Sequence, residues 1–288
     1  MNFRRVALIN LCLALGLFVS SSPGAPSQSQ GPPYEVTFVQ GIVYYEGAGF
    51  NPKKHILDIY MPQGLTKAPV LMFVHGGGWT FGDKSLYSYL GRTFAREGFT
   101  TVVISYRLTP EVMHPGHIED VARAFAWVHK NITKYGGNPE QIFVTGHSAG
   151  GHLTALLALD ERYLEAHGLS TDLIRGALPI SGVYNLNTRP GFNAVFTDDP
   201  QKRRDASPVA HIDDQQPPFL IIYAENDYRT ADAQAIELFN LLKQHGTEAE
   251  LLKIPAKDHI TIITSVGQVG DPTTEAIVNF IRAHIPNH

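Results

Sequence analysis

The chain has 288 residues, of which 43% are hydrophobic and 17% charged, and it contains a single cysteine. This apolar content can bury a core that offsets chain entropy, which excludes an intrinsically disordered protein, and one cysteine excludes a disulfide scaffold. The formal net charge is −4 and the 23 Lys and Arg residues are scattered, so we expect no nucleic-acid partner.

The N-terminus has the pattern of a secretory signal peptide. Arg4 and Arg5 precede an apolar run over residues 6–19, and small residues follow. The run is too short for a membrane anchor, because crossing the hydrocarbon core takes about 20 residues. We therefore expect residues 1–25 to be a signal peptide, with no stable membrane span after cleavage. The sequence thus predicts a secreted or periplasmic protein, without Cys12 after processing.

A polar, flexible leader is expected over residues 26–34, followed by one domain over residues 35–288. Short apolar runs rich in β-branched residues alternate there with helical patterns, which favours parallel strands covered on both faces. The expected strands are residues 36–45, 56–60, 70–74, 101–105, 141–145, 177–181, 219–224 and 249–254. Helices are expected over residues 87–97, 149–165, 231–245 and 273–285. An apolar stripe over residues 118–132 predicts one more helix.

An antiparallel start followed by this alternation predicts an α/β fold. We expect a mostly parallel eight-stranded sheet with helices on both faces. In such sheets, functional residues collect at the carboxyl ends of the strands. The residues that follow each predicted strand are therefore the candidates for chemistry.

A Gly-His-Ser-Ala-Gly segment, residues 146–150, follows the predicted strand at 141–145 and opens a predicted helix. This is the G-x-S-x-G pattern of a nucleophile elbow, in which the glycines allow a sharp turn that exposes the serine hydroxyl. The amide of Ala149 then lies at a helix N-terminus, where free N–H groups favour negative charge. We expect Ser148 to be a nucleophile; the alternative is a Gly-Ser turn that merely ends a strand.

A second glycine-rich segment, residues 75–79 with the sequence His-Gly-Gly-Gly-Trp, follows the predicted strand at 70–74. Consecutive glycines let the main chain approach a ligand closely, and their amides can point at one oxygen. We expect the amides of Gly77 and Gly78 to form an oxyanion hole with that of Ala149. The alternative is a phosphate-binding loop, but no Lys-Ser/Thr pair follows at P-loop spacing.

An acid and a histidine should follow the serine in chain order, each in a loop beyond a strand. Glu225 and Asp227 follow the strand at 219–224, and His259 lies between the strand at 249–254 and the last helix. We prefer Asp227 as the acid, with Glu225 in reserve, and His259 as the base. The three residues would then act as a catalytic triad on an ester carbonyl.

Thirteen histidines compete for the role of base. His75 is expected to hold the glycine loop by a hydrogen bond, and His147 and His152 to point away from the serine between them. His114 and His117 are separated by one proline and one glycine, and no set of Cys or carboxylate ligands lies near them in the sequence. We therefore expect neither a metal nor another cofactor.

Five motifs together resemble one branch of the α/β-hydrolase-fold carboxylesterases. They are residues 58–62 (DIYMP), 75–79 (HGGGW), 82–84 (GDK), 105–108 (SYRL) and 146–152 (GHSAGGH). This branch contains feruloyl and acetyl-xylan esterase-like enzymes, isoprenylcysteine methylesterases and arylformamidases. The resemblance implies hydrolysis of a small ester substrate. Because arylformamidases usually carry a bulkier residue where Gly78 stands, it favours an esterase.

No large insertion interrupts the alternation, so we expect little or no lid. Residues 185–216 leave room for a small cap, and their basic triplet at 202–204 is expected to be a solvated face. A modest pocket rimmed by Trp79, Phe81 and Tyr184 would suit a short-chain or aromatic acyl group. Each of these aromatic residues could instead belong to the core.

Two other functions are compatible with this pattern. A serine peptidase of the prolyl-oligopeptidase type shares the fold and the order of the triad, but normally carries a gating domain. A non-catalytic binding protein can keep the fold, but typically loses a member of the triad. Here each member of the triad has a candidate residue.

Overall fold

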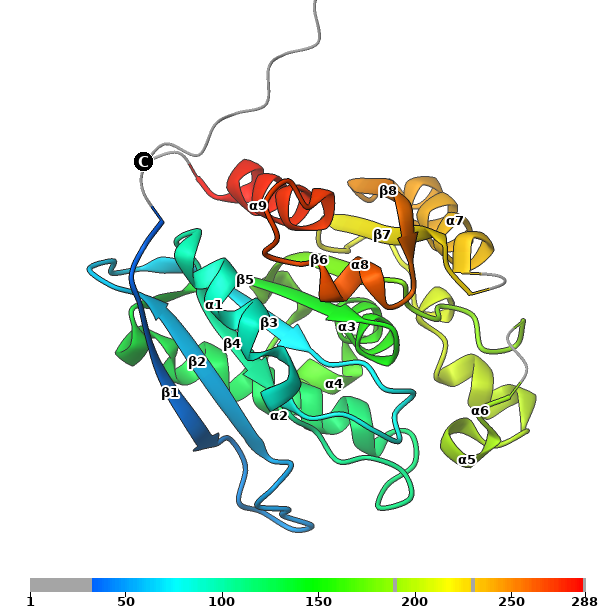
Figure 1. Ribbon diagram of the computed structural model, residues 1–288. Helices are drawn as coiled ribbons and strands as arrows, with labels where there is room; N and C mark the ends of the chain where they lie inside the picture. Colours follow the sequence, from blue (N-terminus) through cyan, green and yellow to red (C-terminus); the bar gives the residue numbers. More distant parts are fainter. Residues whose placement is uncertain (1–32, 189–190, 229–230, 287–288) are drawn as a thin grey trace, which may run out of the picture. The chain divides into compact units, whose positions relative to one another are not determined.

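The eight apolar runs that the sequence predicts as strands form one sheet in the computed structural model of the chain (Figure 1). The strands are β1 (Val36–Val43), β2 (Ile56–Pro62), β3 (Ala68–Val74), β4 (Thr100–Ile104), β5 (Gly137–His147), β6 (Ile174–Ile180), β7 (Phe219–Asn226) and β8 (Ala249–Asp258). Their order in the sheet is β1-β2-β4-β3-β5-β6-β7-β8. Strand β2 runs antiparallel to β1 and β4, and all other neighbours are parallel. The predicted mostly parallel eight-stranded sheet is confirmed.

The structure describes residues 33–188, 191–228 and 231–286. The predicted signal peptide, residues 1–25, lies outside the described residues, and so does most of the predicted leader, residues 26–34. Residues 33–288 form one compact unit. No helix in the described ranges is long and apolar enough to span a membrane.

The five predicted helices are present, one of them divided in two, and the short helices at residues 193–196, 200–205 and 261–264 were not predicted. They are α1 (Ser88–Arg96), α2 (Gly116–Asn131), α3 (Ala149–Leu159), α4 (Arg162–Glu165), α5 (Asn193–Phe196), α6 (Pro200–Asp205), α7 (Ala231–Gln244), α8 (Thr261–Thr264) and α9 (Pro272–His284). The helix predicted over residues 149–165 is two helices, α3 and α4. It breaks at Asp160, whose backbone is extended and whose buried carboxylate accepts a hydrogen bond from Arg162.

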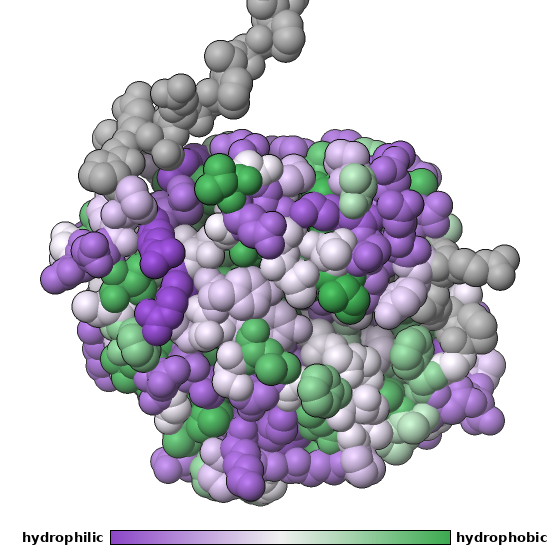
Figure 2. All heavy atoms as spheres, in the orientation of Figure 1, coloured by the Kyte–Doolittle hydropathy of each residue, from purple (hydrophilic) through white to green (hydrophobic). Residues whose placement is uncertain are grey.

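Side chains alternate between the two faces of the sheet, and each face has its own apolar core. In β3, Val70, Met72 and Val74 pack with α2, α3 and α7, whereas Leu71 and Phe73 pack with α1, α8 and α9. Burying one such side chain stabilises the fold by about 1.5–3 kcal/mol. On the surface shown in Figure 2, apolar side chains form small separate groups among polar ones. Both faces of the central strands are therefore covered, and the carboxyl ends of the strands remain available for a site.

Candidate active site

The turn between β5 and α3 presents Ser148. Strand β5 ends at His147 and helix α3 begins at Ala149, so Ser148 alone makes the turn, with φ 56° and ψ −117°. Its amide donates to the carbonyl of Ile180 on β6 at 2.9 Å. A side chain at Gly146 would overlap the carbonyl of Gly150, and one at Gly150 would overlap the carbonyl of Val74. Only glycine fits at these two positions, which explains the G-x-S-x-G spacing.

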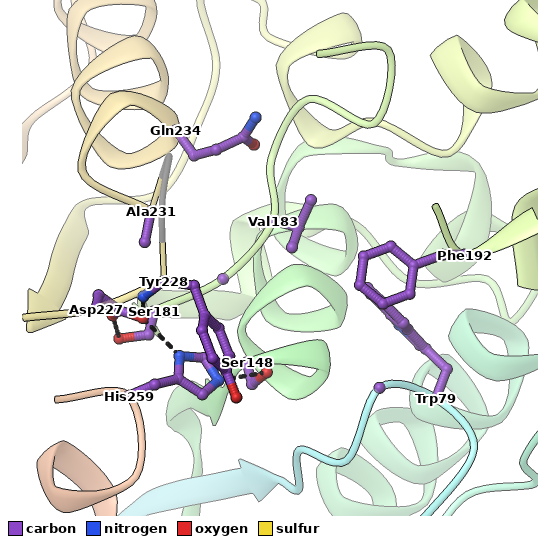
Figure 3. A pocket seen from close by; sticks show the side chains of 12 residues that line it. Trp79, Ser148, Ser181, Val183, Phe192, Asp227, Tyr228, Ala231, Gln234 and His259 are labelled. Carbon is purple, nitrogen blue, oxygen red and sulfur yellow. Dashed lines mark hydrogen bonds and ion pairs between the residues drawn. The ribbon is translucent and has the colours of Figure 1, made fainter. Parts of the chain in front are cut away.

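The structure brings Ser148, His259 and Asp227 into one chain of hydrogen bonds (Figure 3). The Nε2 atom of His259 lies 2.9 Å from Oγ of Ser148, and its Nδ1 atom lies 2.6 Å from Oδ1 of Asp227. A carboxylate only accepts hydrogen bonds, so Nδ1 carries the proton and Nε2 of the neutral ring is free to accept. This tautomer can take a proton from the serine hydroxyl.

Asp227 is held as an anion. Burial by itself would raise the pKa of its carboxyl, but hydrogen bonds from His259 and Ser181 outweigh it, and the pKa lies below its ordinary value. Ser181 donates to Oδ2 at 2.5 Å, and the amide of Tyr228 donates to Oδ1 at 2.8 Å. A fixed negative charge beside Nδ1 is therefore available to stabilise a protonated imidazole.

Glu225, the reserve candidate for the acid, lies elsewhere. Its carboxylate accepts from the amide of Ala256 at 2.9 Å and lies 3.8 Å from Nζ of Lys253. Its side chain is 43% exposed. Between the two acids, the geometry favours Asp227.

His147, which we expect to point away from Ser148, lies against His259. Strand β5 continues through His147, and its Nε2–H donates to the carbonyl of His259 at 2.8 Å. The two imidazole rings lie 4.6 Å apart, and burial together with His259 lowers the pKa of His147 to about 3. His147 is thus a neutral donor that fixes the main chain of the base. His152, by contrast, bonds to the carbonyl of Ala206.

The glycine loop lies beside Ser148. Gly77 and Gly78 line the same cavity as Ser148, with φ of 118° and 59°. In the part of the chain that the structure describes, neither of their amides donates to a protein acceptor. Ala149 supplies the first amide of α3. These three amides are therefore available for a ligand oxygen.

His75 is enclosed beneath this loop. Its Nδ1 atom lies 2.8 Å from the carbonyl oxygen of Gly76, and its ring stacks on Tyr106 at 4.3 Å. Burial lowers the pKa of His75 to about 4, so the ring is neutral at pH 7. Its contacts are those of a residue that holds the loop.

Two cavities meet at Ser148, which we name the inner and the outer chamber. Both are lined by Gly78, Ser148, Phe192, Tyr228 and His259. The inner chamber, of about 50 Å³, is further lined by Trp79, Ser181, Gly182, Val183, Asp227, Ala231 and Gln234. The outer chamber, of about 650 Å³, is further lined by Gly77, Phe81, Leu86, Tyr87, Tyr89, His147, Ile260, Ile263 and Thr264. In Figure 3, Trp79 and Phe192 face the triad across the inner chamber.

The predicted pocket residues have different outcomes. Trp79 lines the inner chamber, although its side chain is almost fully buried, and Phe81 lines the outer chamber. Tyr184 lines neither chamber, so the expectation that it rims the pocket is wrong. It is 1% exposed, and its hydroxyl turns back to accept a hydrogen bond from the amide of Gly182.

The connection between β6 and β7 forms a small cap with helices α5 and α6. Within its basic triplet, Arg203 is not on the solvated face that the sequence predicts. Its side chain is buried and donates to the carbonyls of Leu186, Gly191 and Thr197. Lys202 and Arg204 are exposed.

Sequence reasoning missed three residues that line the site. Ser181 follows β6 and could have been found by the rule that strand ends carry function. Tyr228 directly follows Asp227, and its ring lies 4.2 Å from that of His259. Phe192 comes from the cap, where no motif marks it.

The His114–His117 loop takes part in the core. Nε2 of His117 lies 3.2 Å from Oγ1 of Thr109, and burial lowers the pKa of both histidines to about 4. Among the described residues, no group of three or more His, Cys, Asp or Glu side chains could hold a metal ion.

Comparison with known proteins finds similarity to proteins named esterase or carboxylic ester hydrolase. Residues 57–175 match the family model described as BD-FAE. Esterase LipQ of Mycobacterium tuberculosis (strain ATCC 25618 / H37Rv) is 34% identical, over 69% of this chain and 52% of LipQ. The probable carboxylic ester hydrolase LipM of the same strain is 37% identical, over 65% of this chain and 48% of LipM. The chain thus spans about half the length of these two relatives.

A plant relative and two solved structures extend the comparison. The probable isoprenylcysteine alpha-carbonyl methylesterase ICMEL1 of Oryza sativa subsp. japonica is 28% identical, over 87% of this chain and 67% of ICMEL1. Esterase B from Lactobacillus rhamnosis has a TM-score of 0.74 at 22% identity, covering 88% of this chain and 86% of its own. An esterase from Pyrobaculum calidifontis has a TM-score of 0.70 at 24% identity, covering 88% of each chain. The structures show the shared fold, and the predicted resemblance to this branch of esterases is confirmed.

Proposed function

From the premise that this chain has the α/β-hydrolase fold and matches the BD-FAE model over residues 57–175, we propose that it is a serine carboxylesterase. Its substrates are small carboxylic esters, with short-chain or aromatic acyl groups. The observation that carries the proposal is the hydrogen-bonded series Ser148, His259 and Asp227, beside free main-chain amides. The names of the relatives LipQ and LipM support the same activity.

The first half of the reaction forms an acyl-enzyme. Nε2 of His259 takes the proton of Ser148 as Oγ attacks the ester carbonyl, and collapse of the tetrahedral intermediate breaks the C–O bond to the alcohol. Asp227 holds the tautomer and stabilises the imidazolium. The same His259 then gives its proton to the departing alkoxide. Water, deprotonated by His259, releases the acid and restores Ser148.

The amides of Gly77, Gly78 and Ala149 are proposed to bind the oxyanion. They are fixed before the substrate arrives, so no reorganisation is required as negative charge develops. Removal of one such donor costs about 3–4 kcal/mol of transition-state stabilisation in comparable sites. No metal or organic cofactor has a step in this mechanism.

Hydrolysis of p-nitrophenyl acetate, butyrate and palmitate, beside a dipeptidyl anilide, tests the proposal. We expect cleavage of the two short esters, little of palmitate and none of the anilide. Ser148→Ala should lower kcat by about 10⁴-fold or more. Ser170→Ala is the matched control, because Ser170 is exposed and precedes β6 at the far end of the strand. Full activity in Ser148→Ala would remove the mechanism, and cleavage of the anilide alone would favour a peptidase.

We also propose that the protein is exported. The support is the sequence pattern of Arg4 and Arg5 before the apolar run at 6–19. Expression of the full chain with N-terminal sequencing of the exported product tests this. A product beginning near residue 26 is expected, whereas retention of Met1 in the cytoplasm would contradict export.

A further inference from the structure

The outer chamber offers a large apolar surface with few free polar groups. It is lined by Phe81, Leu86, Tyr87, Tyr89, Ile260 and Ile263, and by no acidic, lysine, arginine or carboxamide side chain. Two of its hydroxyls are already engaged, since Tyr89 donates to the carbonyl of Ile263 at 2.9 Å and Thr264 to that of Ile260 at 3.1 Å. A bound group rich in hydroxyls would find few partners here to replace its hydrogen bonds to water.

Three exposed apolar side chains converge on the mouth of this chamber from separate segments. Phe81 is 68% exposed, Leu86 52% and Ile260 56%. They come from the glycine loop, from the 3₁₀ helix at Lys84–Tyr87 and from the loop after β8. Exposed apolar side chains that gather around a cavity mark a binding surface, whereas single ones need no explanation.

The inner chamber is small, and hydrogen bonds hold its wall at Gln234. Gln234 closes one end, with its Oε1 atom accepting from the amides of Tyr184 and Asn185 at 2.7 Å. Its Nε2 atom donates to the carbonyl of Asn185 and to Thr188. Because both ends of this amide are bonded, the chamber cannot widen at Gln234 without breaking these hydrogen bonds. Its capacity is a few heavy atoms, against more than ten times the volume outside.

We propose that the substrates are asymmetric esters, in which the acyl group and the alcohol group differ in size. The smaller group, of a few carbons, binds in the inner chamber, and the larger, apolar or aromatic group binds in the outer chamber. Esters of carbohydrates are poor substrates. This inference rests on the proposed esterase function and names the substrate class of that site. The ester bond lies at Ser148, where the two chambers meet.

A panel of alkyl esters of similar intrinsic reactivity tests this. (2-Naphthyl)methyl acetate and methyl 3-(2-naphthyl)propanoate each have one large half, on opposite sides of the ester bond. (2-Naphthyl)methyl 3-phenylpropanoate has two large halves, and glucose 6-acetate has a polar one. We expect kcat/KM for at least one of the two asymmetric naphthyl esters to exceed that of both (2-naphthyl)methyl 3-phenylpropanoate and glucose 6-acetate by about tenfold or more. Equal kcat/KM values across the panel, or a preference for glucose 6-acetate, would overturn the proposal.

Variants at the mouth test the chamber directly. Phe81→Gln and Leu86→Gln should raise KM for the preferred naphthyl ester several-fold and should raise KM for ethyl acetate less. Val269→Gln is the matched control, because Val269 is fully exposed and lines neither chamber. An equal effect of all three variants would contradict the assignment of the outer chamber.

A fluorophosphonate that labels serine nucleophiles separates the two proposals. Absence of labelling at Ser148 in the folded protein defeats the esterase function itself. Labelling at Ser148 with no preference in the panel defeats only the inferred substrate class.

Discussion

The catalytic triad and the cap are built in different ways. Triad residues follow strands directly, and the register of the sheet brings them together. Asn226 pairs with Asp258, one residue before Asp227 and His259. His147 pairs with Ile180, one residue before Ser148 and Ser181. The chemistry is therefore placed by many main-chain hydrogen bonds at once.

The described part of the cap, residues 185–216 without 189–190, has only short helices, and single side chains hold it. Arg203 donates to three carbonyls of the cap. Gln234, on helix α7 outside the cap, forms hydrogen bonds with the main chain of Asn185. Nevertheless this segment contributes Phe192 to both chambers. The comparison teaches that one set of contacts fixes reactivity and another fixes the shape of the pocket. Substitutions should separate the two.

Among substitutions that distinguish the triad from the cap, the largest loss of kcat is expected at the acid, Asp227. Asp227→Asn should lower kcat by about 10⁴-fold, because the amide favours the wrong tautomer of His259. Steady-state hydrolysis of p-nitrophenyl butyrate measures it. Glu225→Gln is the matched control and should change kcat by less than about threefold, since an exposed acid contributes little. Equal losses in both variants would leave Asp227 unsupported as the acid.

An intermediate effect is expected at His147, which fixes the main chain of the base. His147→Ala removes the donor to the carbonyl of His259, and kcat should fall by about 10–100-fold, as expected when a catalytic group is misplaced. His147→Gln keeps an N–H donor and should recover much of the loss, with KM little changed in both variants. If glutamine is no better than alanine while both variants keep the wild-type Tm, the hydrogen bond is not what positions His259.

The smallest effect on catalysis is expected in the cap. Arg203→Met leaves buried carbonyls without a donor, which should lower the free energy of unfolding by about 1–3 kcal/mol. We expect Tm to fall and KM to rise more than kcat falls, because the triad keeps its register. Thermal unfolding and steady-state kinetics measure both. Lys202→Met is the exposed control, with an expected change within about 0.5 kcal/mol. A loss confined to kcat would contradict the separation of cap and triad.

Much of the fold and of the reactive centre could be predicted from the sequence. Strands were predicted because buried parallel strands need nearly continuous apolar runs. Ser148 and the glycine loop were predicted because close main-chain approaches at Gly146, Gly150 and Gly77 exclude every larger residue. Asp227 and His259 were placed by their position after strands. In each case a conformational requirement on a short segment restricts which residue types can stand there, so the segment can be recognised in the sequence.

The tertiary structure alone decided the contacts that join distant segments. The pairing of His147 with His259, the burial of Arg203 and the inward turn of Tyr184 depend on which neighbours fill the space around them. The chambers likewise depend on side chains from the glycine loop, the cap and the loop after β8. Local sequence restricts the conformation of a segment, but packing between segments sets the direction of a side chain and the volume that is left empty.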